Sequence, residues 1–556
     1  MLKSTAGLVS AGLFLAVASA VLGQQHDHGA PSQESGQNMT PAPLLVGLGH
    51  LHHPITTSNA LAQRYFDQGL TLVYAFNHEE AARSFSYAAK LDPKCAMAYW
   101  GIALARGPNY NEWEIDAGRE KIAAEAVKKA GTLAGGSSAA EQAYIRALAK
   151  RLSTDPKADQ KKLGASYRDA MREVMRRYPD DMDAAVLFAD SAMDLHAWKL
   201  WRPDGKPEEG TMEAAQALES VLKRDPDNIG ANHFYIHVVE ASPHPEQAMA
   251  SAQKLADLAP GAGHLVHMPA HIYIRTGDYH ASSVSNEQAM GADRGYIDKY
   301  HVDGMYSMMY YTHNMHFLAV SSSMEGDFEH SNRVAAQITK GLTPMVKEHP
   351  ELQMFLPTQT LVLVRFRRWA EIEQLPEPGK SLDQAHALWR FARGMAFSSE
   401  GKKDQAASER AAFAAEVTAL PAKEAFGYNT AAQIFDIATW MLDASIARGQ
   451  RDYKAAAALL TKAAQAEDAL NYDEPPDWHL PPRESLGAVL FLDGRPAEAE
   501  TVFRAELKAH PKNPRALFGL AECLHAQGNA AEESAARKEF EAGWKHADTH
   551  LRIEDL

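Results

Sequence analysis

The sequence predicts an all-α protein, organised as a right-handed α-solenoid of stacked helix–turn–helix repeats. Alanine is abundant and runs of β-branched residues are scarce, which favours helix over sheet. The chain has 556 residues, too many for one ordinary compact core, so several domains or a repeat array are expected. A repeat array is favoured because His233 and His237 are followed 34 residues later by His267 and His271.

Composition and charge exclude some classes of function. Hydrophobic residues make up 46% and charged residues 23% of the chain, as in ordinary globular proteins. The formal net charge of −15 argues against nucleic acid as a partner, because phosphate binding needs a basic face. Cys95 and Cys523 are the only cysteines, so one disulfide remains open and a disulfide framework is excluded.

The first residues have the pattern of a secretory signal peptide. Lys3 supplies the positive charge, Leu8–Ala18 the apolar stretch, and Ala18-Ser19-Ala20 a small-residue cleavage site. We therefore predict a signal peptide over residues 1–20, with an alternative cut after residue 23. The mature protein is expected to be exported, and periplasmic or secreted in a bacterial source. No later run approaches 18 apolar residues, so no membrane span is expected.

Two short segments precede the first predicted helix. Residues 21–43 are rich in Gln, Ser, Gly and Pro, as is typical of a disordered linker. Residues 44–60 form an arm with three histidines, His50, His52 and His53. The arm either folds against the solenoid through these histidines or carries them as plain surface residues.

The segment from Ala62 to Pro93 contains one complete helical pair. Gly69 lies where the first helix needs a small residue, and Ala81 and Phe85 supply a small-then-large pair on the second. The pattern returns in full at Gly487, Gly494, Ala499, Phe503 and Pro511, and in part at Gly394, Gly401 and Ala406 and at the turns Gly277-Asp278-Tyr279 and Gly326-Asp327-Phe328.

This pattern resembles the tetratricopeptide repeat. The resemblance implies a solenoid over residues 61–545, followed by a tail at 546–556, with each unit packing only on its neighbours. Loops inserted at 107–113, 198–210 and 471–482 interrupt the strict period. The chain also resembles a broader group of exported bacterial tetratricopeptide proteins in AFNHEEAARSF, CAMAYWGIALARGPNYN, GHLVHMPAHIYIR and YDEPPDWHLPPRESLG. That group has no established activity, so this second resemblance implies fold and export only.

Histidines recur at matched positions in three successive repeats. With the repeats in phase, they fall at places of the first helix that line the concave groove in solenoids of this family. The fifth place holds His233, His267 and His316, the ninth His237 and His271, the second His264 and His313, and the twelfth Glu240. Spacings of three, four and seven residues put the members of each helix on one face.

This register predicts a transition-metal site in the concave groove. Two histidines at i and i+4 form a chelating pair, and packed helices stand about 8–10 Å apart, so neighbouring pairs can converge. Imidazole donors suit Zn²⁺, Cu²⁺ or Fe²⁺. The predicted core ligands are His233, His237, His267 and His271, with His264, His313, His316 and Glu240 completing or supporting the set. Asp190 and Asp194 of the preceding repeat are candidates for further ligands or for orienting an imidazole.

Two other functions remain open from the sequence. The groove of a metal-free scaffold would instead grip an extended segment of a protein or peptide partner. A metal-dependent hydrolase or oxidoreductase would need a substrate pocket beside the metal. No recognised catalytic motif occurs, so enzymatic activity stays undecided. Asn109, Asn111, Glu474 and Trp478 lie in the inserted loops, which are expected to cover the groove.

Overall fold

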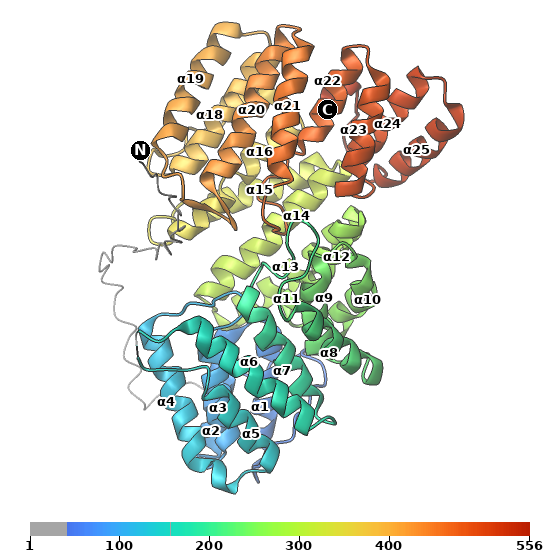
Figure 1. Ribbon diagram of the computed structural model, residues 1–556. Helices are drawn as coiled ribbons and strands as arrows, with labels where there is room; N and C mark the ends of the chain where they lie inside the picture. The colour runs from blue at the N-terminus through green and yellow to red at the C-terminus, as the bar shows by residue number, and fades with distance from the viewer. Residues whose placement is uncertain (1–41, 156) are drawn as a thin grey trace, which may run out of the picture. The chain divides into compact units, whose positions relative to one another are not determined.

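A computed structural model describes residues 42–155 and 157–556 of the chain. Within these residues the predicted fold class is confirmed, because almost all regular structure is α-helix and consecutive helices pack as pairs. Figure 1 shows the pairing clearly for α18–α21, which lie side by side in the orange part of the chain. Residues 44–556 group into one unit by their internal contacts.

The elements follow one another in this order. The helices are α1 (Ala60–Tyr74), α2 (His78–Leu91), α3 (Ala96–Arg106), α4 (Ala117–Leu133), α5 (Ala139–Leu148), α6 (Gln160–Arg177), α7 (Met182–Met193), α8 (Thr211–Arg224), α9 (Ile229–Glu240), α10 (Met249–Leu258), α11 (Gly263–His267), α12 (Pro269–Thr276), α13 (Tyr279–Tyr300), α14 (Tyr311–Glu325), α15 (Phe328–Leu342), α16 (Thr358–Arg365), α17 (Trp369–Gln374), α18 (Asp383–Ser399), α19 (Lys403–Ala419), α20 (Ala431–Gly449), α21 (Tyr453–Glu467), α22 (Pro482–Leu492), α23 (Pro496–Ala509), α24 (Pro514–Ala526) and α25 (Ala530–Gly543). Strands β1 (Ala425–Phe426) and β2 (Asn429–Thr430) form a small antiparallel hairpin before α20. Short turns of other helix types include the π-helix Tyr306–Tyr310 and the 3₁₀ turn Ile553–Asp555.

The glycine and phenylalanine of the repeat pattern pack on each other as the sequence predicts. A Cβ on Gly69 of α1 or on Gly101 of α3 would overlap the ring of Phe85 on α2. Phe503 on α23 has the same relation to Gly487 on α22 and Gly519 on α24. Because glycine has no side chain, the phenylalanine ring of the middle helix packs between the two helices beside it and fills the core there.

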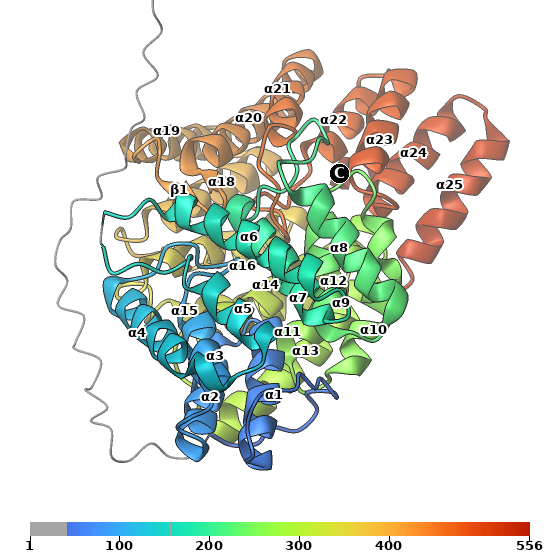
Figure 2. The same ribbon diagram turned by 60° about the horizontal axis from the view of Figure 1, so that its bottom comes forward.

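The prediction that each unit packs only on its neighbours is wrong. Helix α1 packs on α9, more than 150 residues later, and a side chain of the loop after α3 bonds to Tyr310 just before α14. Tyr279 at the start of α13 donates a hydrogen bond to the carbonyl of Pro511. In Figures 1 and 2 the blue N-terminal helices α1–α3 lie in the same part of the molecule as the green helices α8–α12, and α1 contacts α9. The array therefore folds back on itself, and its interior collects side chains from distant repeats.

Several sequence predictions concern the chain ends and cysteines. The predicted signal peptide (1–20), the cut after residue 23 and residues 21–41 of the linker lie outside the described residues. None of the helices in 42–155 and 157–556 combines the length and apolar character needed to cross a lipid bilayer. Cys95 and Cys523 are both buried and free, so the disulfide left open by the sequence does not form.

Candidate functional site

Four helices bring the predicted histidines together. Six of the seven fall into two groups of three, and within each group one nitrogen from each ring lies within 4.8 Å of the others. The groups are His233, His237 and His264, here called triad 1, and His267, His271 and His313, here called triad 2. Helices α9, α11, α12 and α14 carry them, and only Pro269 interrupts the register between α11 and α12. The matched register predicted from the sequence therefore does bring six imidazoles together.

The triads lie in the interior, and not on an exposed surface of the concave groove. His233 and His267 have 0% of their surface exposed, and His264, the most exposed of the five on α9, α11 and α12, has 4%. His313 is half-buried. The physical reason is the return of the array on itself, which lays α1 and the inserted loops over the histidine face.

In triad 1 two rings are held by hydrogen bonds at Nδ1. His233 Nδ1 donates to the main-chain carbonyl of Tyr74 on α1, at 2.6 Å. His237 Nδ1 bonds to Oε1 of Glu240, at 2.8 Å and one helical turn away. Their Nε2 atoms are therefore left free to face His264, whose own Nε2 lies 3.1 Å from Nε2 of His233. The Nε2 of His237 is buried without a hydrogen-bond partner.

Triad 2 is built in the same way. His267 Nδ1 donates to Oδ1 of Asn286 on α13, at 2.7 Å, and the amide group of Asn286 donates in turn to the carbonyl of Ser282. His271 Nδ1 contacts the second oxygen of Glu240 in an ion-pair geometry. The Nε2 of His267 then lies 2.8 Å from that of His271 and 3.1 Å from that of His313.

Glu240 connects the two triads. One carboxylate oxygen binds His237 of triad 1 and the other binds His271 of triad 2, and the group is 1% exposed. The two histidines hold the pKa of this buried carboxyl well below its ordinary value, against the opposing effect of burial. Its position behind two Nδ1 atoms is that of a carboxylate orienting metal-binding histidines, whereas the sequence included it among candidate ligands.

These contacts assign the proton of several rings. When Nδ1 donates to a carbonyl, an amide oxygen or a carboxylate, a neutral imidazole carries no hydrogen on Nε2. His267 thus presents a lone pair at Nε2, which lies 2.8 Å from Nε2 of His271. Around a tetrahedral Zn²⁺ with bonds of 2.0–2.1 Å, two ligand nitrogens stand about 3.3 Å apart. A cation placed between the two rings would be ligated by both nitrogens.

A proton is a poor candidate for that cation. Burial, followed by the neighbouring His313 and His271, lowers the pKa of His267 well below its ordinary value. Burial and nearby imidazoles likewise lower the pKa of His233 and His264, and bring the pKa of His313 to about 3. Neutral imidazoles are the form that binds metal, so the interior that disfavours a proton prepares these rings as ligands.

Aromatic rings cover the triads. Phe76, at the end of α1, stacks on His237 and His264 with ring centroids 5.6 and 5.1 Å apart. Tyr110, from the first inserted loop, lies 5.3 Å from the ring of His237. The second inserted loop supplies Trp198, whose ring lies 5.9 Å from that of His237. The predicted covering role of these loops agrees with the geometry, and the neighbouring Asn111 ties them together by bonding Trp198 and Tyr310.

Other predicted residues lie apart from the triads. His316 is buried against the rings of Phe355 and His479. Asp190 and Asp194 interact with each other and Asp194 with Arg151, and burial raises the pKa of Asp194 to about 7. The third inserted loop does reach the triads, because its buried Glu474 interacts electrostatically with His271 and Glu240. Asn109 and Trp478, the other residues predicted in the inserted loops, are also buried.

The sequence analysis missed the groups that orient the rings or pack against them. The carbonyl of Tyr74, the amide of Asn286 and the ring of His479 carried no recognisable signal. Phe76 did carry one, because it stands at a turn position where Gly277 and Gly326 stand in other repeats.

The N-terminal arm folds against the solenoid, as one of the two sequence interpretations predicted. His53 Nδ1 bonds to Oδ2 of Asp183 on α7 at 2.7 Å, and Tyr74 donates to the other oxygen. His53, Asp181 and Asp183 form a third group with metal-ligand spacing, beside a cavity of about 760 Å³. Hydrogen bonds within the group already satisfy Asp183, so this arrangement serves as a structural clasp for the arm.

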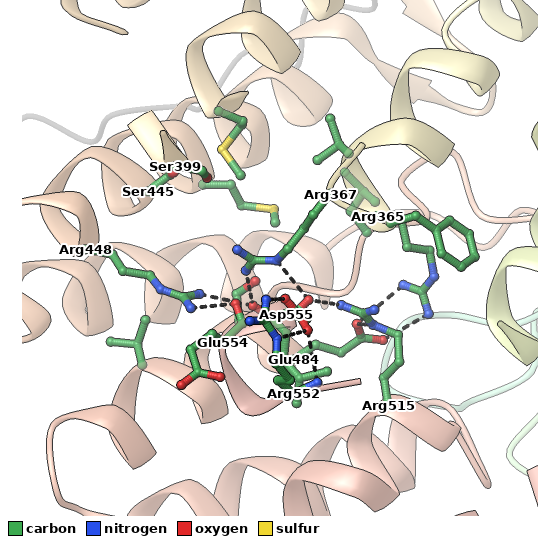
Figure 3. Close-up of a pocket in the computed structure, with 18 of the residues that line it drawn as sticks. Arg365, Arg367, Ser399, Ser445, Arg448, Glu484, Arg515, Arg552, Glu554 and Asp555 are labelled. Atoms are coloured by element: carbon green, nitrogen blue, oxygen red, sulfur yellow. Dashed lines mark hydrogen bonds and ion pairs between the residues drawn. The ribbon is translucent and has the colours of Figure 1, made fainter. Parts of the chain in front are cut away.

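A second cavity, of about 960 Å³, lies among the C-terminal helices and is lined by arginines (Figure 3). Arg367, Arg448 and Arg515 point into it and donate to main-chain carbonyls of the segment Glu554–Leu556, with Arg367 to Leu556 at 2.6 Å and Arg448 to Glu554 at 2.7 Å. This cavity thus holds the 3₁₀ turn at residues 553–555 and Leu556 by their backbone.

Comparison with known proteins supports the repeat character. A tetratricopeptide repeat model matches residues 66–106 and 487–543. Solved structures similar to the chain include the human IFIT1 dimer with m7Gppp-AAAA, which is 13% identical, with 89% of this chain and 92% of that one covered and a TM-score of 0.31. Yeast Tom70 is 12% identical over 86% and 92%, with a TM-score of 0.28. The Cut9–Hcn1 hetero-tetramer of the APC/C is 13% identical over 85% and 78%, with a TM-score of 0.32. No curated protein matches the chain.

The matched segments coincide with the two places where the glycine–phenylalanine packing is complete, around Phe85 and Phe503. The helices between them follow the same pairwise arrangement. The described part of the chain is therefore almost entirely helical, and its segments 66–106 and 487–543 match the tetratricopeptide repeat.

Proposed function

We propose that the protein binds transition-metal ions through the two buried histidine triads. The observation that carries this proposal is the approach of the Nε2 atoms to one another, at 2.8–3.1 Å. At the centre of each triad, the Nδ1 of His233 or His267 donates to an oxygen, so that its Nε2 offers a lone pair to a metal ion. The orienting partners of Nδ1, a carbonyl, an amide and a carboxylate, are those that metal-binding histidines ordinarily have.

The imidazole ligands limit which metal ions the triads can bind. Ligation by imidazole nitrogens alone suits Zn²⁺, Cu²⁺ or Fe²⁺ and disfavours Mg²⁺ and Ca²⁺, which prefer oxygen. Three protein ligands leave one position of a tetrahedral ion open for water or substrate. Hydrolytic or oxidative chemistry at such a position is the extension of this proposal in which the protein is an enzyme. We also propose, from the N-terminal pattern alone, that the protein is exported.

Metal content tests the proposal directly. Protein purified without a histidine tag is expected to contain Zn, Cu or Fe in at least stoichiometric amount by elemental analysis. The double variant His267→Ala/His271→Ala should lose metal from triad 2 while it keeps its helical circular dichroism, because two of three ligands are removed. The control is His244→Ala/His525→Ala, in which both substituted side chains are about two-thirds exposed. Metal-free protein whose melting temperature does not respond to added Zn²⁺ or Cu²⁺ would overturn the proposal.

A second candidate function is binding of a protein partner, and the comparisons favour it. Tetratricopeptide repeats are commonly scaffolds, although fold alone does not assign function. The specific observation is the arginine-lined cavity, where Arg367, Arg448 and Arg515 bind backbone oxygens of Asp555 and Leu556. Such contacts do not depend on side-chain identity, so they suit a peptide segment of varied sequence.

This second function predicts binding of an added peptide once the resident segment is removed. A chain ending at residue 548 should bind a synthetic peptide of residues 549–556 in a calorimetric titration, and Arg448→Ala should weaken that binding. Lys402→Ala, outside the cavity, is the control. Absence of measurable binding by a truncated chain that remains folded would count against the partner-binding function at this cavity.

A further inference from the structure

The six histidines form two groups, each with the ligands for one ion. Three imidazoles complete the protein share of a tetrahedral site with one open position. Triad 1 converges on Nε2 of His233, and triad 2 converges on Nε2 of His267. We infer that the centre is dinuclear, with one transition-metal ion in each triad. This inference rests on the proposed metal-binding function and extends it to the number and coupling of the ions.

The two triads touch. Across the boundary the ring centroids of His237 and His271 lie 5.6 Å apart, and those of His264 and His267 lie 5.8 Å apart. These distances resemble those within a triad, such as 4.9 Å between His233 and His237. Two ions held in neighbouring triads would therefore share one interior.

Glu240 couples the two ions. Its Oε1 orients His237 in triad 1 and its Oε2 contacts His271 in triad 2. A carboxylate with one oxygen committed to each triad transmits a change at one ion to the ligand field of the other. The two-sided arrangement of Glu240 thus links the ligands of one triad to those of the other.

Two buried carboxylates lie near the triads and would balance part of the charge of two metal ions. Glu240 supplies one negative charge in direct contact with two of the ligands. Glu474, from the third inserted loop, is 4% exposed, interacts electrostatically with Arg275, His271 and Glu240, and has one carboxylate oxygen without a hydrogen-bond partner. Arg275 supplies one positive charge near this buried carboxylate, and an ion in triad 2 would supply a further one. Glu240 and Glu474 would therefore offset part of the charge of two metal ions.

Titration of metal-free protein with Zn²⁺, followed by elemental analysis after gel filtration, tests this inference. We expect two Zn²⁺ per chain, one for each triad. His264→Ala should remove the ion of triad 1, and His313→Ala should remove that of triad 2, so each variant should retain one Zn²⁺. His264→Gln and His313→Gln provide milder replacements if an alanine variant fails to fold. His244→Ala, on an exposed turn near the same helices, should retain both ions.

Electron paramagnetic resonance of protein loaded with Cu²⁺ gives an independent readout. Two neighbouring Cu²⁺ ions interact magnetically, so the wild type should show a broadened or diminished signal. Each single-triad variant should show the full signal of one isolated Cu²⁺.

The outcomes separate the two levels of the proposal. One Zn²⁺ per wild-type chain, lost in both His264→Ala and His313→Ala, would mean one mononuclear site and would overturn the dinuclear inference alone. Two Zn²⁺ with two isolated Cu²⁺ signals would deny the coupling through a shared interior. No bound Zn²⁺ or Cu²⁺ in the wild type would overturn the proposed function as well.

Discussion

At the scale of single residues, the chemistry of the centre depends on what each Nδ1 contacts. The carbonyl of Tyr74, the amide oxygen of Asn286 and the carboxylate of Glu240 each accept a hydrogen bond from Nδ1 of a ring, so that the Nε2 of that ring faces inward with a lone pair. A histidine without such a partner can rotate or change tautomer. His264 is such a histidine, because its Nδ1 is buried without a partner and its role depends on the rings around it.

The substitution Glu240→Gln should weaken metal binding without removing a ligand. Loss of an orienting group behind a metal-binding histidine ordinarily lowers metal affinity about 10–100-fold, and Glu240 orients one histidine in each triad. We therefore expect a fall of about 10–100-fold in Zn²⁺ affinity at both triads, with the number of bound ions unchanged. Competition with a chromophoric chelator measures it.

Glu246→Gln is the matched control, since Glu246 is exposed and pairs only with the exposed His244. A loss of one whole equivalent of Zn²⁺ in Glu240→Gln would instead assign Glu240 as a direct ligand, as the sequence analysis had it.

The sequence predicts the ligands better than their surroundings. Helical periodicity places His264, His267 and His271 on one face, and the structure has them there. Periodicity carries no information about Asn286, which belongs to the following helix, nor about which ring nitrogen faces inward. Those features follow from contacts between helices, and a single sequence encodes them only through packing. His316 shows the same limit, because it shares a repeat position with His233 and His267 yet packs against Phe355.

At the scale of elements, the turn between α1 and α2 departs from the other repeats. The residue two places before the second helix has a left-handed backbone, and glycine fills it at Gly277 and Gly326 with φ of 78° and 87°. Phe76 takes the same place with φ of 54°. A left-handed conformation costs a residue with a Cβ about 1–2 kcal/mol. The stacking of the Phe76 ring on His237 and His264 offsets this backbone strain.

The substitution Phe76→Gly should keep the turn and expose the metal centre. Loss of a buried phenylalanine costs about 3–5 kcal/mol. Relief of the left-handed residue returns about 1–2 kcal/mol, so the free energy of unfolding should fall by about 1–4 kcal/mol. With the ring gone, release of metal to excess chelator should become several-fold faster. Stopped-flow chelator kinetics and denaturant unfolding measure the two effects.

Arg451→Gly serves as the control for the turn itself. Arg451 occupies the same left-handed position before α21, with φ of 61°, is exposed and lies far from the histidines in the repeat order. Its replacement should leave metal release unchanged. Equal release rates in Phe76→Gly and the wild type would show that the ring has no covering role.

Elements were also where the sequence was most informative about the fold. The helix pairs around Phe85 and Phe503 and the turns at Gly277 and Gly326 follow from local patterns of glycine, proline and apolar residues. The inserted loops were recognised because they break the period. The sequence alone does not predict that these loops lie over the histidines and bury the centre. That position arises from long-range contacts, such as the contact of Tyr110 with His237, 127 positions later.

At the scale of the whole molecule, metal binding joins parts of the array that a simple solenoid keeps independent. In a linear array, stability is a sum of the repeats and their nearest-neighbour interfaces. Here triad 1 is fixed to α1 through Tyr74, and triad 2 to α13 through Asn286. Metal in the triads therefore stabilises the helices from α9 to α14 together with α1, and the C-terminal helices α18–α21 gain nothing directly.

Hydrogen exchange with and without a chelator should resolve this difference along the chain. At a free metal concentration 100 times the dissociation constant, binding stabilises the bound form by about 2.7 kcal/mol, which is about a 100-fold change in the equilibrium of opening. We expect amide protection in α9, α11, α12 and α14 to fall by about this factor on metal removal. Protection in α18–α21 should change little, and those helices act as the internal control. An equal fall along the whole chain would mean that the array opens as one cooperative unit, since only then does stabilisation at one place protect every helix alike.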